Sequence, residues 1–155
     1  MKYWIMSAAL VAAVCAGVVW VASSAAPTPQ DLVDARVAGM KKMGGDVKAA
    51  LNPAAAPAEA KAKLAEAAVF AGSISSKFPK GTGIGDPGVT KSRALQDIWA
   101  KPAEFKAAAD ALVAVLKTVD AALDSGDRAK IDLAAGEVGK SCGGCHKPFR
   151  GPEIE

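Results

Sequence analysis

The sequence predicts an all-α protein, an antiparallel four-helix bundle, and three observations lead to this prediction. Four segments carry apolar or small residues at alternating steps of four and three, which is the spacing of one helix face. Two of the connections between these segments are short and one is longer, as in a four-helix bundle. No segment shows the alternation of apolar and polar residues that is typical of a strand. The 155 residues fit one such domain after a targeting segment.

The first two helices have recognisable borders. The first should begin at Pro29, with Thr28 as its N-cap, and end at Asn52-Pro53. Its apolar stripe contains Val33, Val37, Met40, Gly44, Val47 and Leu51. The second should open at Pro57 and stop before Pro79. Its stripe contains Ala60, Leu64, Ala67, Ala71, Ile74 and Phe78. Both stripes are expected to face the core.

A glycine-rich stretch separates the two halves of the bundle. A phosphate-binding G-x-G-x-x-G fingerprint fails here, because Asp86 occupies the place of the last glycine and no strand precedes it. We therefore expect residues 80–90 to form a flexible crossover loop. Residues 91–100 include Leu95, Ile98 and Trp99, and should form a partly helical approach that packs on the bundle.

The last two helices are joined by a tight turn. The third should start near Pro102, with a stripe of Phe105, Ala109, Leu112, Leu116, Val119 and Leu123. Gly126 should close it, and Asp127 should lie near the start of the fourth helix. The fourth carries Ile131, Ala135, Val138, Cys142, Cys145 and Phe149, and Gly151-Pro152 ends it. Two cysteines therefore lie on the stripe that faces the core.

These cysteines belong to a C-x-x-C-H run, Cys142-Gly143-Gly144-Cys145-His146, which is the attachment signature of c-type haem. Two thiols at this spacing can add to the two vinyl groups of a porphyrin, and the next residue, His146, can then reach the iron. On a helix these residues project from adjacent turns of one face. His146 is the only histidine of the chain. We expect one covalent haem c, held inside the bundle.

Other chemistry of this motif needs a different context. A redox dithiol of the thioredoxin type would be expected in a βαβ unit, and a structural zinc site needs four ligands. Without residues 1–26, the chain offers two cysteines and one histidine. A disulfide between Cys142 and Cys145 in a haem-free bundle stays an alternative.

The N-terminus predicts export. Lys2 precedes an uncharged run from Tyr3 through Ala26, and Ser24-Ala25-Ala26 supplies small residues for cleavage. We expect a signal peptide over residues 1–26 and a periplasmic bundle over residues 27–155. An uncleaved membrane anchor is the alternative, because the run approaches the length of a membrane span.

The composition favours a buried cofactor and does not favour nucleic-acid binding. Aromatic residues are only 5% of the chain, so a buried porphyrin would fill a core that has few large side chains. The formal charge of +3 is weak and dispersed, which does not favour nucleic-acid binding.

With these residues placed, the chain resembles the cytochrome c′ and cytochrome c-556 family, the class II c-type cytochromes. The C-x-x-C-H run followed by Arg150 carries most of the resemblance, together with the segments 36–41 and 94–99. In this family, an arginine is common at the place of Arg36, and the residue facing the open side of the haem follows four positions later. That residue here is Met40.

The resemblance leaves two functions open. In c-556-like members a methionine binds the iron, so the first interpretation is a low-spin electron carrier with His146 and Met40 as iron ligands. The alternative is a five-coordinate, high-spin cytochrome c′ that binds nitric oxide or carbon monoxide, in which Met40 only fills space. Neither is an enzyme in its own right. Redox partner proteins are expected for the carrier, and the family includes homodimers.

Two arginines are candidates for contacts with the haem propionates or the haem edge, Arg36 and Arg150, because the arginine fork suits carboxylates. The alternative for Arg36 is a solvated surface side chain. Phe149 is expected to pack on the haem or on a neighbouring helix.

Overall fold

The structure is a computed structural model that describes residues 26–152, and this part of the chain is helical. The elements are α1 (Pro29–Ala50), α2 (Pro57–Ser73), the short 3-10 helix η1 (Ile74–Lys77), α3 (Asp97–Ala100), α4 (Pro102–Ser125) and α5 (Arg128–Phe149). Among these residues the only strand-like feature is an isolated antiparallel bridge between Ala94 and Arg150. The four-helix bundle is confirmed. Residues 1–25 lie outside the described part, so the signal peptide stays a prediction.

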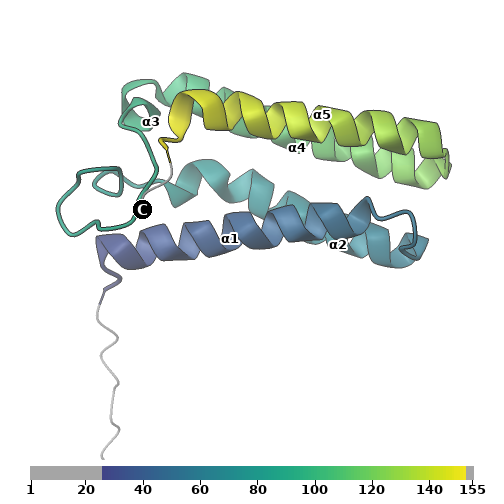
Figure 1. Cartoon of the computed structure of the whole chain (residues 1–155), viewed down its shortest axis with the longest axis horizontal. Helices are drawn as coiled ribbons and strands as arrows, with labels where there is room; N and C mark the ends of the chain where they lie inside the picture. Colours follow the sequence, from purple (N-terminus) through teal and green to yellow (C-terminus); the bar gives the residue numbers. More distant parts are fainter. Residues whose placement is uncertain (1–25, 153–155) are drawn as a thin grey trace, which may run out of the picture.

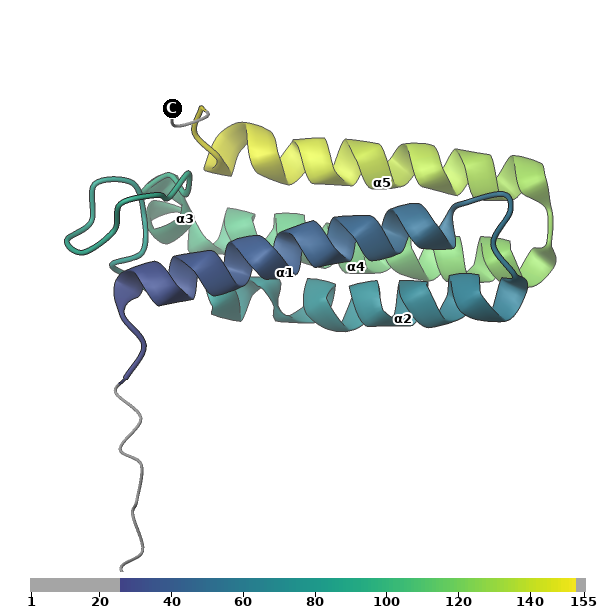
Figure 2. The same ribbon diagram turned by 60° about the horizontal axis from the view of Figure 1, so that its bottom comes forward.

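The long helices form two antiparallel pairs (Figure 1). α1 packs on α2, α4 packs on α5, and α2 joins the pairs by packing on α4, whereas α1 and α5 do not form a packed pair. The beginning of α1, the end of α5 and the segment around α3 lie at the same end of the molecule (Figures 1 and 2). Within residues 26–152, no helix is long and apolar enough to cross a bilayer.

Local chemistry explains the helix borders. Thr28 and Asp31 form a reciprocal capping box at the start of α1. Gly126 closes α4 in the left-handed conformation, with φ of 64°, and the Asp127 side chain accepts hydrogen bonds from the first turn of α5. These features confirm the predicted turn. α2 ends earlier than predicted, because the backbone tightens into η1 before Pro79.

The predicted stripes of the second and third helices form the core. Leu64, Ile74 and Leu116 are at most 4% exposed. An aromatic row crosses one end of this core, because Phe105 makes edge-to-face contacts with Phe78 and Phe149, with ring centroids 4.9 and 5.2 Å apart. These contacts link η1, α4 and the last turn of α5.

The stripe predicted for α1 is only partly correct, since Val33 is buried and Val47 and Leu51 pack against the core. The structure buries the face that carries Val33, Arg36, Met43, Asp46 and Ala50. Of the predicted residues, Val37 is 41% exposed, Gly44 is exposed and Met40 is half-buried. The reason is that α1 packs on α2 and not on α5, so only the face toward α2 is fully covered by protein.

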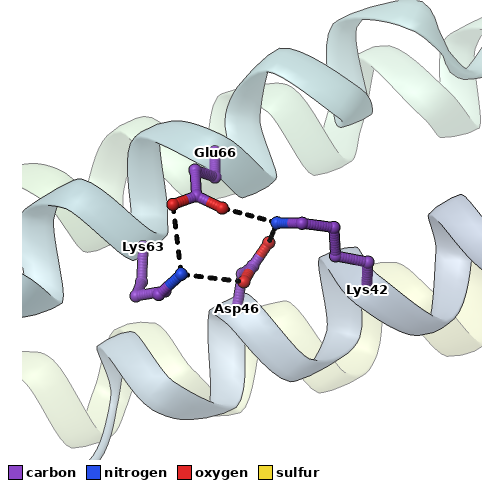
Figure 3. Close-up of polar contacts among 4 residues, drawn as sticks. All are labelled: Lys42, Asp46, Lys63 and Glu66. Carbon is purple, nitrogen blue, oxygen red and sulfur yellow. Dashed lines mark hydrogen bonds and ion pairs between the residues drawn. The ribbon is translucent and has the colours of Figure 1, made fainter.

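Charged side chains fasten α1 to α2 (Figure 3). The Lys42 ammonium contacts Asp46 at 2.6 Å and Glu66 at 2.5 Å, and Lys63 contacts Glu66 at 3.1 Å and Asp46 at 3.7 Å. Asp46 comes from the buried face of α1. The four residues form a closed ring of opposite charges across the two helices.

The segment between η1 and α3 is not the freely flexible loop that the sequence predicted. Gln30 Oε1 accepts hydrogen bonds from the backbone N–H groups of Thr90 and Lys91, which ties the segment to the start of α1. At its other end, the Leu95 N–H donates to Phe149 O at 3.0 Å and the Gly151 N–H donates to Arg93 O at 2.7 Å. The segment therefore connects the first helix with the last.

Candidate haem site

The C-x-x-C-H residues lie in the last turns of α5. Cys142 and Cys145 are half-buried, pack against the hydrophobic core and are not joined by a disulfide. Burial raises the pKa of both thiols, so they stay protonated at neutral pH. A redox dithiol requires the opposite shift. The geometry thus presents two thiols, one turn apart, on the inward side of one helix.

His146 is also half-buried, and its surroundings favour the neutral imidazole. Burial lowers the pKa of His146, and the positive charges of Arg150 and Arg93 lower it further. A neutral ring is the form that binds a metal. Within residues 26–152 no three His, Cys, Asp or Glu side chains are placed to hold a metal ion.

The face of α1 that protein leaves uncovered carries Val37, Met40, Gly44 and Val47. Met40 and Val47 pack only partly against the core. Gly44 and Val47 also line an open hollow of ≈ 810 Å³ toward the end of α1. Met43 is turned into the core at 8% exposure. Met40, and not Met43, is thus the methionine on the uncovered face.

Arg36 is neither solvated nor at the surface. It is 4% exposed, and its guanidinium lies 4.4 Å from the centre of the Phe78 ring. Nη1 donates to Thr82 Oγ1 at 2.6 Å, while Nη2 donates to Thr82 O at 2.6 Å and to Ser92 Oγ at 2.9 Å. Burial lowers the pKa of Arg36 to about 10.

All of these acceptors are neutral, and none of the ion pairs found within residues 26–152 includes Arg36. A buried cation without a carboxylate is costly, so this site favours a nearby anionic group. Arg150 is exposed, and its charge acts on His146. The two arginines therefore serve different places: Arg36 holds the 79–92 segment, and Arg150 lies beside the histidine.

Sequence reasoning missed Thr82, Ser92 and Arg93 at this end of the bundle. Thr82 and Ser92 are 1% and 3% exposed, although Thr82 belongs to the stretch predicted to be a loop and Ser92 to the approach that follows it. Arg93 Nε donates to Gly151 O at 2.9 Å, and its charge reaches His146. No periodic pattern marks these residues, because they act from irregular backbone.

The residues present fit a covalently attached porphyrin. Two thiols and one neutral imidazole lie together on α5, α1 leaves a partly apolar face uncovered, and a buried arginine lacks a carboxylate partner among the described residues. Fold and site together define a helical-bundle haem protein of the c type.

Comparison with known proteins gives the family. A family model described as cytochrome C′ matches residues 31–150. A cytochrome c′ from Pararhodospirillum photometricum is 35% identical over 127 residues, which are 79% of this chain and 98% of that protein.

Solved structures agree with this match. One, described as a nitric oxide complex of a variant cytochrome c prime from Alcaligenes xylosoxidans, has a TM-score of 0.66 and 26% identity, and the match covers 81% of this chain and 98% of that one. Another is a cytochrome c′ described as having an unusual ligand-controlled dimer dissociation; it has a TM-score of 0.69 and 25% identity over 83% of this chain and all of that chain.

The chain belongs to the cytochrome c′ family. It is a c-type cytochrome, and its relatives carry one covalent haem c. Between the two functions left open by the sequence, the comparisons favour the gas-binding cytochrome c′ over the low-spin carrier with two protein ligands.

Proposed function

We propose that this protein is an exported, five-coordinate cytochrome c′ that binds nitric oxide or carbon monoxide. The observation that carries the proposal is the place of Met40. It lies on the uncovered face of α1, yet its side chain packs against the hydrophobic core, as a space-filling methionine does. α1 itself is fastened to α2 by the ring of charges in Figure 3.

Each site residue has a separate task. Cys142 and Cys145 would hold the porphyrin by thioether bonds, and a ring nitrogen of His146 would bind its iron. When bound, the haem would supply an iron that takes up a diatomic gas or an electron. Met40 and Val37 would add apolar cover from α1, and Phe149 closes the core at the end of α5. Burial, and after it the charges of Arg150 and Arg93, lower the pKa of His146 and favour the neutral imidazole.

Carbon monoxide uptake by the reduced holoprotein tests the proposal. The visible spectrum should be high-spin in the absence of gas, and addition of carbon monoxide should shift it to a low-spin form. Met40→Ala should leave the starting spectrum high-spin and speed gas uptake by about tenfold, because a smaller side chain obstructs the site less. A low-spin spectrum of the unmutated protein, with no uptake, would contradict the proposal.

The second candidate is the electron carrier with His146 and Met40 as ligands. Its support is that Met40, and not Met43, lies on the uncovered face of α1. A soft thioether suits haem iron, and His/Met ligation raises the reduction potential. The same variant separates the candidates, because Met40→Ala should convert a low-spin protein of this type into a high-spin one.

The remaining expectations belong to this proposal. We place the protein in the periplasm, with redox partner proteins, and we assign it no catalytic residues. Self-association is supported by the relative described as showing ligand-controlled dimer dissociation. Sedimentation with and without carbon monoxide tests whether this chain forms a dimer.

A further inference from the structure

We propose that Arg36 is a positioning residue, which sets how far α1 and its Met40 stand from the last turn of α5 by clamping the segment 79–92. The inference rests on the proposed function, because it assigns to this clamp the control of access to the gas-binding side. It differs from the expected contact of Arg36 with a propionate, since it depends on the protein partners of Arg36.

The clamp starts on α1, one turn before Met40. The Arg36 guanidinium holds Thr82 through both the hydroxyl and the carbonyl oxygen, and it holds Ser92 through the hydroxyl. Thr82 Oγ1 donates in turn to Pro79 O at 2.8 Å, and Ser92 Oγ donates to Thr82 O at 3.0 Å. Thr82 and Ser92, which lie toward opposite ends of the segment, therefore both bind the buried Arg36 side chain. Hydrogen bonds to a charged donor are stronger than neutral ones.

From this clamp, hydrogen bonds lead to α5. The Ala94 N–H donates to Ser92 Oγ at 3.2 Å, and Ala94 forms the antiparallel bridge with Arg150. The Arg150 N–H donates to His146 O at 3.0 Å. An unbroken series of contacts therefore runs from Arg36 on the first helix to His146 on the last.

The aromatic row gives a second route between the same places. The Arg36 guanidinium lies over Phe78, Phe78 contacts Phe105, and Phe105 contacts Phe149, three residues after His146. Arg36 is the residue at which the polar and the aromatic routes meet. Gln30 adds a further tie to the same segment, but it lies at the very start of α1.

The clamp matters because α1 and α5 do not pack on each other. Their separation is not fixed by interdigitated side chains, as it is for α1 and α2 or for α4 and α5. The segment 79–92 is tied to α1 through Arg36, and residues 93–95, which follow it directly, hydrogen-bond to Phe149 and Gly151 at the end of α5. Loosening it should let Met40 move relative to the histidine without removing any haem ligand.

The first test compares gas binding in three clamp variants, Arg36→Gln, Thr82→Val and Ser92→Ala. The last two keep the guanidinium, so any contact of Arg36 with a propionate is retained. We expect faster carbon monoxide association, by about tenfold for Arg36→Gln and less for Ser92→Ala. Arg36→Lys should restore part of the wild-type rate. Arg128→Gln is the matched control, because it removes an exposed arginine that pairs with Asp132 on its own helix.

The second test does not depend on gas binding. Spin labels at Lys41→Cys on α1 and Lys140→Cys on α5, both exposed positions, report the distance between the helices in a Cys15→Ser background. The clamp variants should lengthen or broaden this distance, and Arg128→Gln should not. Folded clamp variants with unchanged distances would overturn the inference, whatever their gas-binding rates and stability.

The two tests also separate the inference from the proposed function. If the unmutated protein takes up no carbon monoxide, the proposed function fails, while altered distances in the clamp variants still support the positioning role. If gas binds and the distances do not respond, the clamp fails alone. Should Arg36→Gln not fold, Ser92→Ala decides the outcome, because it removes one acceptor and leaves the buried charge its other partners.

Discussion

α1 meets its two neighbours in opposite ways. Toward α2, the ring of charges formed by Lys42, Asp46, Lys63 and Glu66 crosses the interface (Figure 3). Gly39 also lies so close to Phe70 that a Cβ built on it would stand 2.0 Å from the nearest atom of the Phe70 side chain. Toward α5, α1 forms no packed pair and leaves Met40 half-buried. Protein atoms alone fill the α1–α2 interface, whereas they leave the side of α1 toward α5 only partly covered.

This difference indicates that different contacts stabilise the fold and the haem site. The α1–α2 pair is held by protein contacts, so it should persist without haem. The side toward α5 needs a bulky apolar group to be filled, because an unfilled side loses both burial and dispersion contacts. The following changes test that division.

The largest effect is expected from Cys142→Ala combined with Cys145→Ala. The protein should lose the added mass of one haem, and its free energy of unfolding should fall by about 4 kcal/mol or more, the scale for losing a tightly bound ligand. Mass spectrometry and thermal unfolding measure both. Ser141→Ala is the control, because its Oγ is buried without a hydrogen-bond partner in the described structure, and its loss should cost little. An unchanged mass in the double variant would contradict haem attachment.

A smaller effect is expected from Gly39→Ala, which attacks the α1–α2 contact alone. The new methyl group would overlap Phe70, and the strain should lower the free energy of unfolding by about 1–3 kcal/mol. Gly45→Ala on the same helix meets nothing within 4 Å, and should raise stability by about 0.5–1 kcal/mol. Chemical denaturation measures the pair. Equal effects of the two variants would show that the α1–α2 approach is not close.

The smallest effect is expected from Glu66→Gln, and it should depend on pH. Hydrogen bonds from Lys42, then Lys63, lower the pKa of the Glu66 carboxyl in the folded protein. A lowered folded-state pKa gives stability that is present above the unfolded pKa of about 4.3 and is lost as the pH falls through the folded value. The melting temperature of Glu66→Gln should therefore lie slightly below wild type at pH 7, and the difference should vanish near pH 3. A difference that stays constant with pH would exclude the ion pairs as its cause.

The sequence predicted the fold well where protein covers a helix on two sides, as it does for α2 between α1 and α4 and for α4 between α2 and α5. The stripes of the second and third helices, the Thr28 cap and the Gly126 turn are all found, because periodicity and capping are local properties. It assigned part of the α1 stripe wrongly, because it placed every apolar or small residue of the pattern on the buried face. Val37, Met40 and Gly44 are apolar or small, yet protein alone does not bury them.

The shared half-buried face of the C-x-x-C-H run was also predictable, because its spacing on a helix brings these residues together. The structure brings Cys142, Cys145 and His146 to one half-buried face, as expected. The partners of Arg36 were not predictable. Thr82 and Ser92 are brought to it by tertiary contacts over 46 and 56 positions, and a glycine-rich stretch has no periodicity from which burial could be inferred.

The bridge between Ala94 and Arg150 has a consequence for biogenesis. The ribosome makes α1, α2 and α4 before it reaches the residues that attach the haem, and the Gly151 N–H that fastens the end of α5 to Arg93 comes later still. The bridge between Ala94 and Arg150 can therefore close only after the whole C-x-x-C-H run has been made.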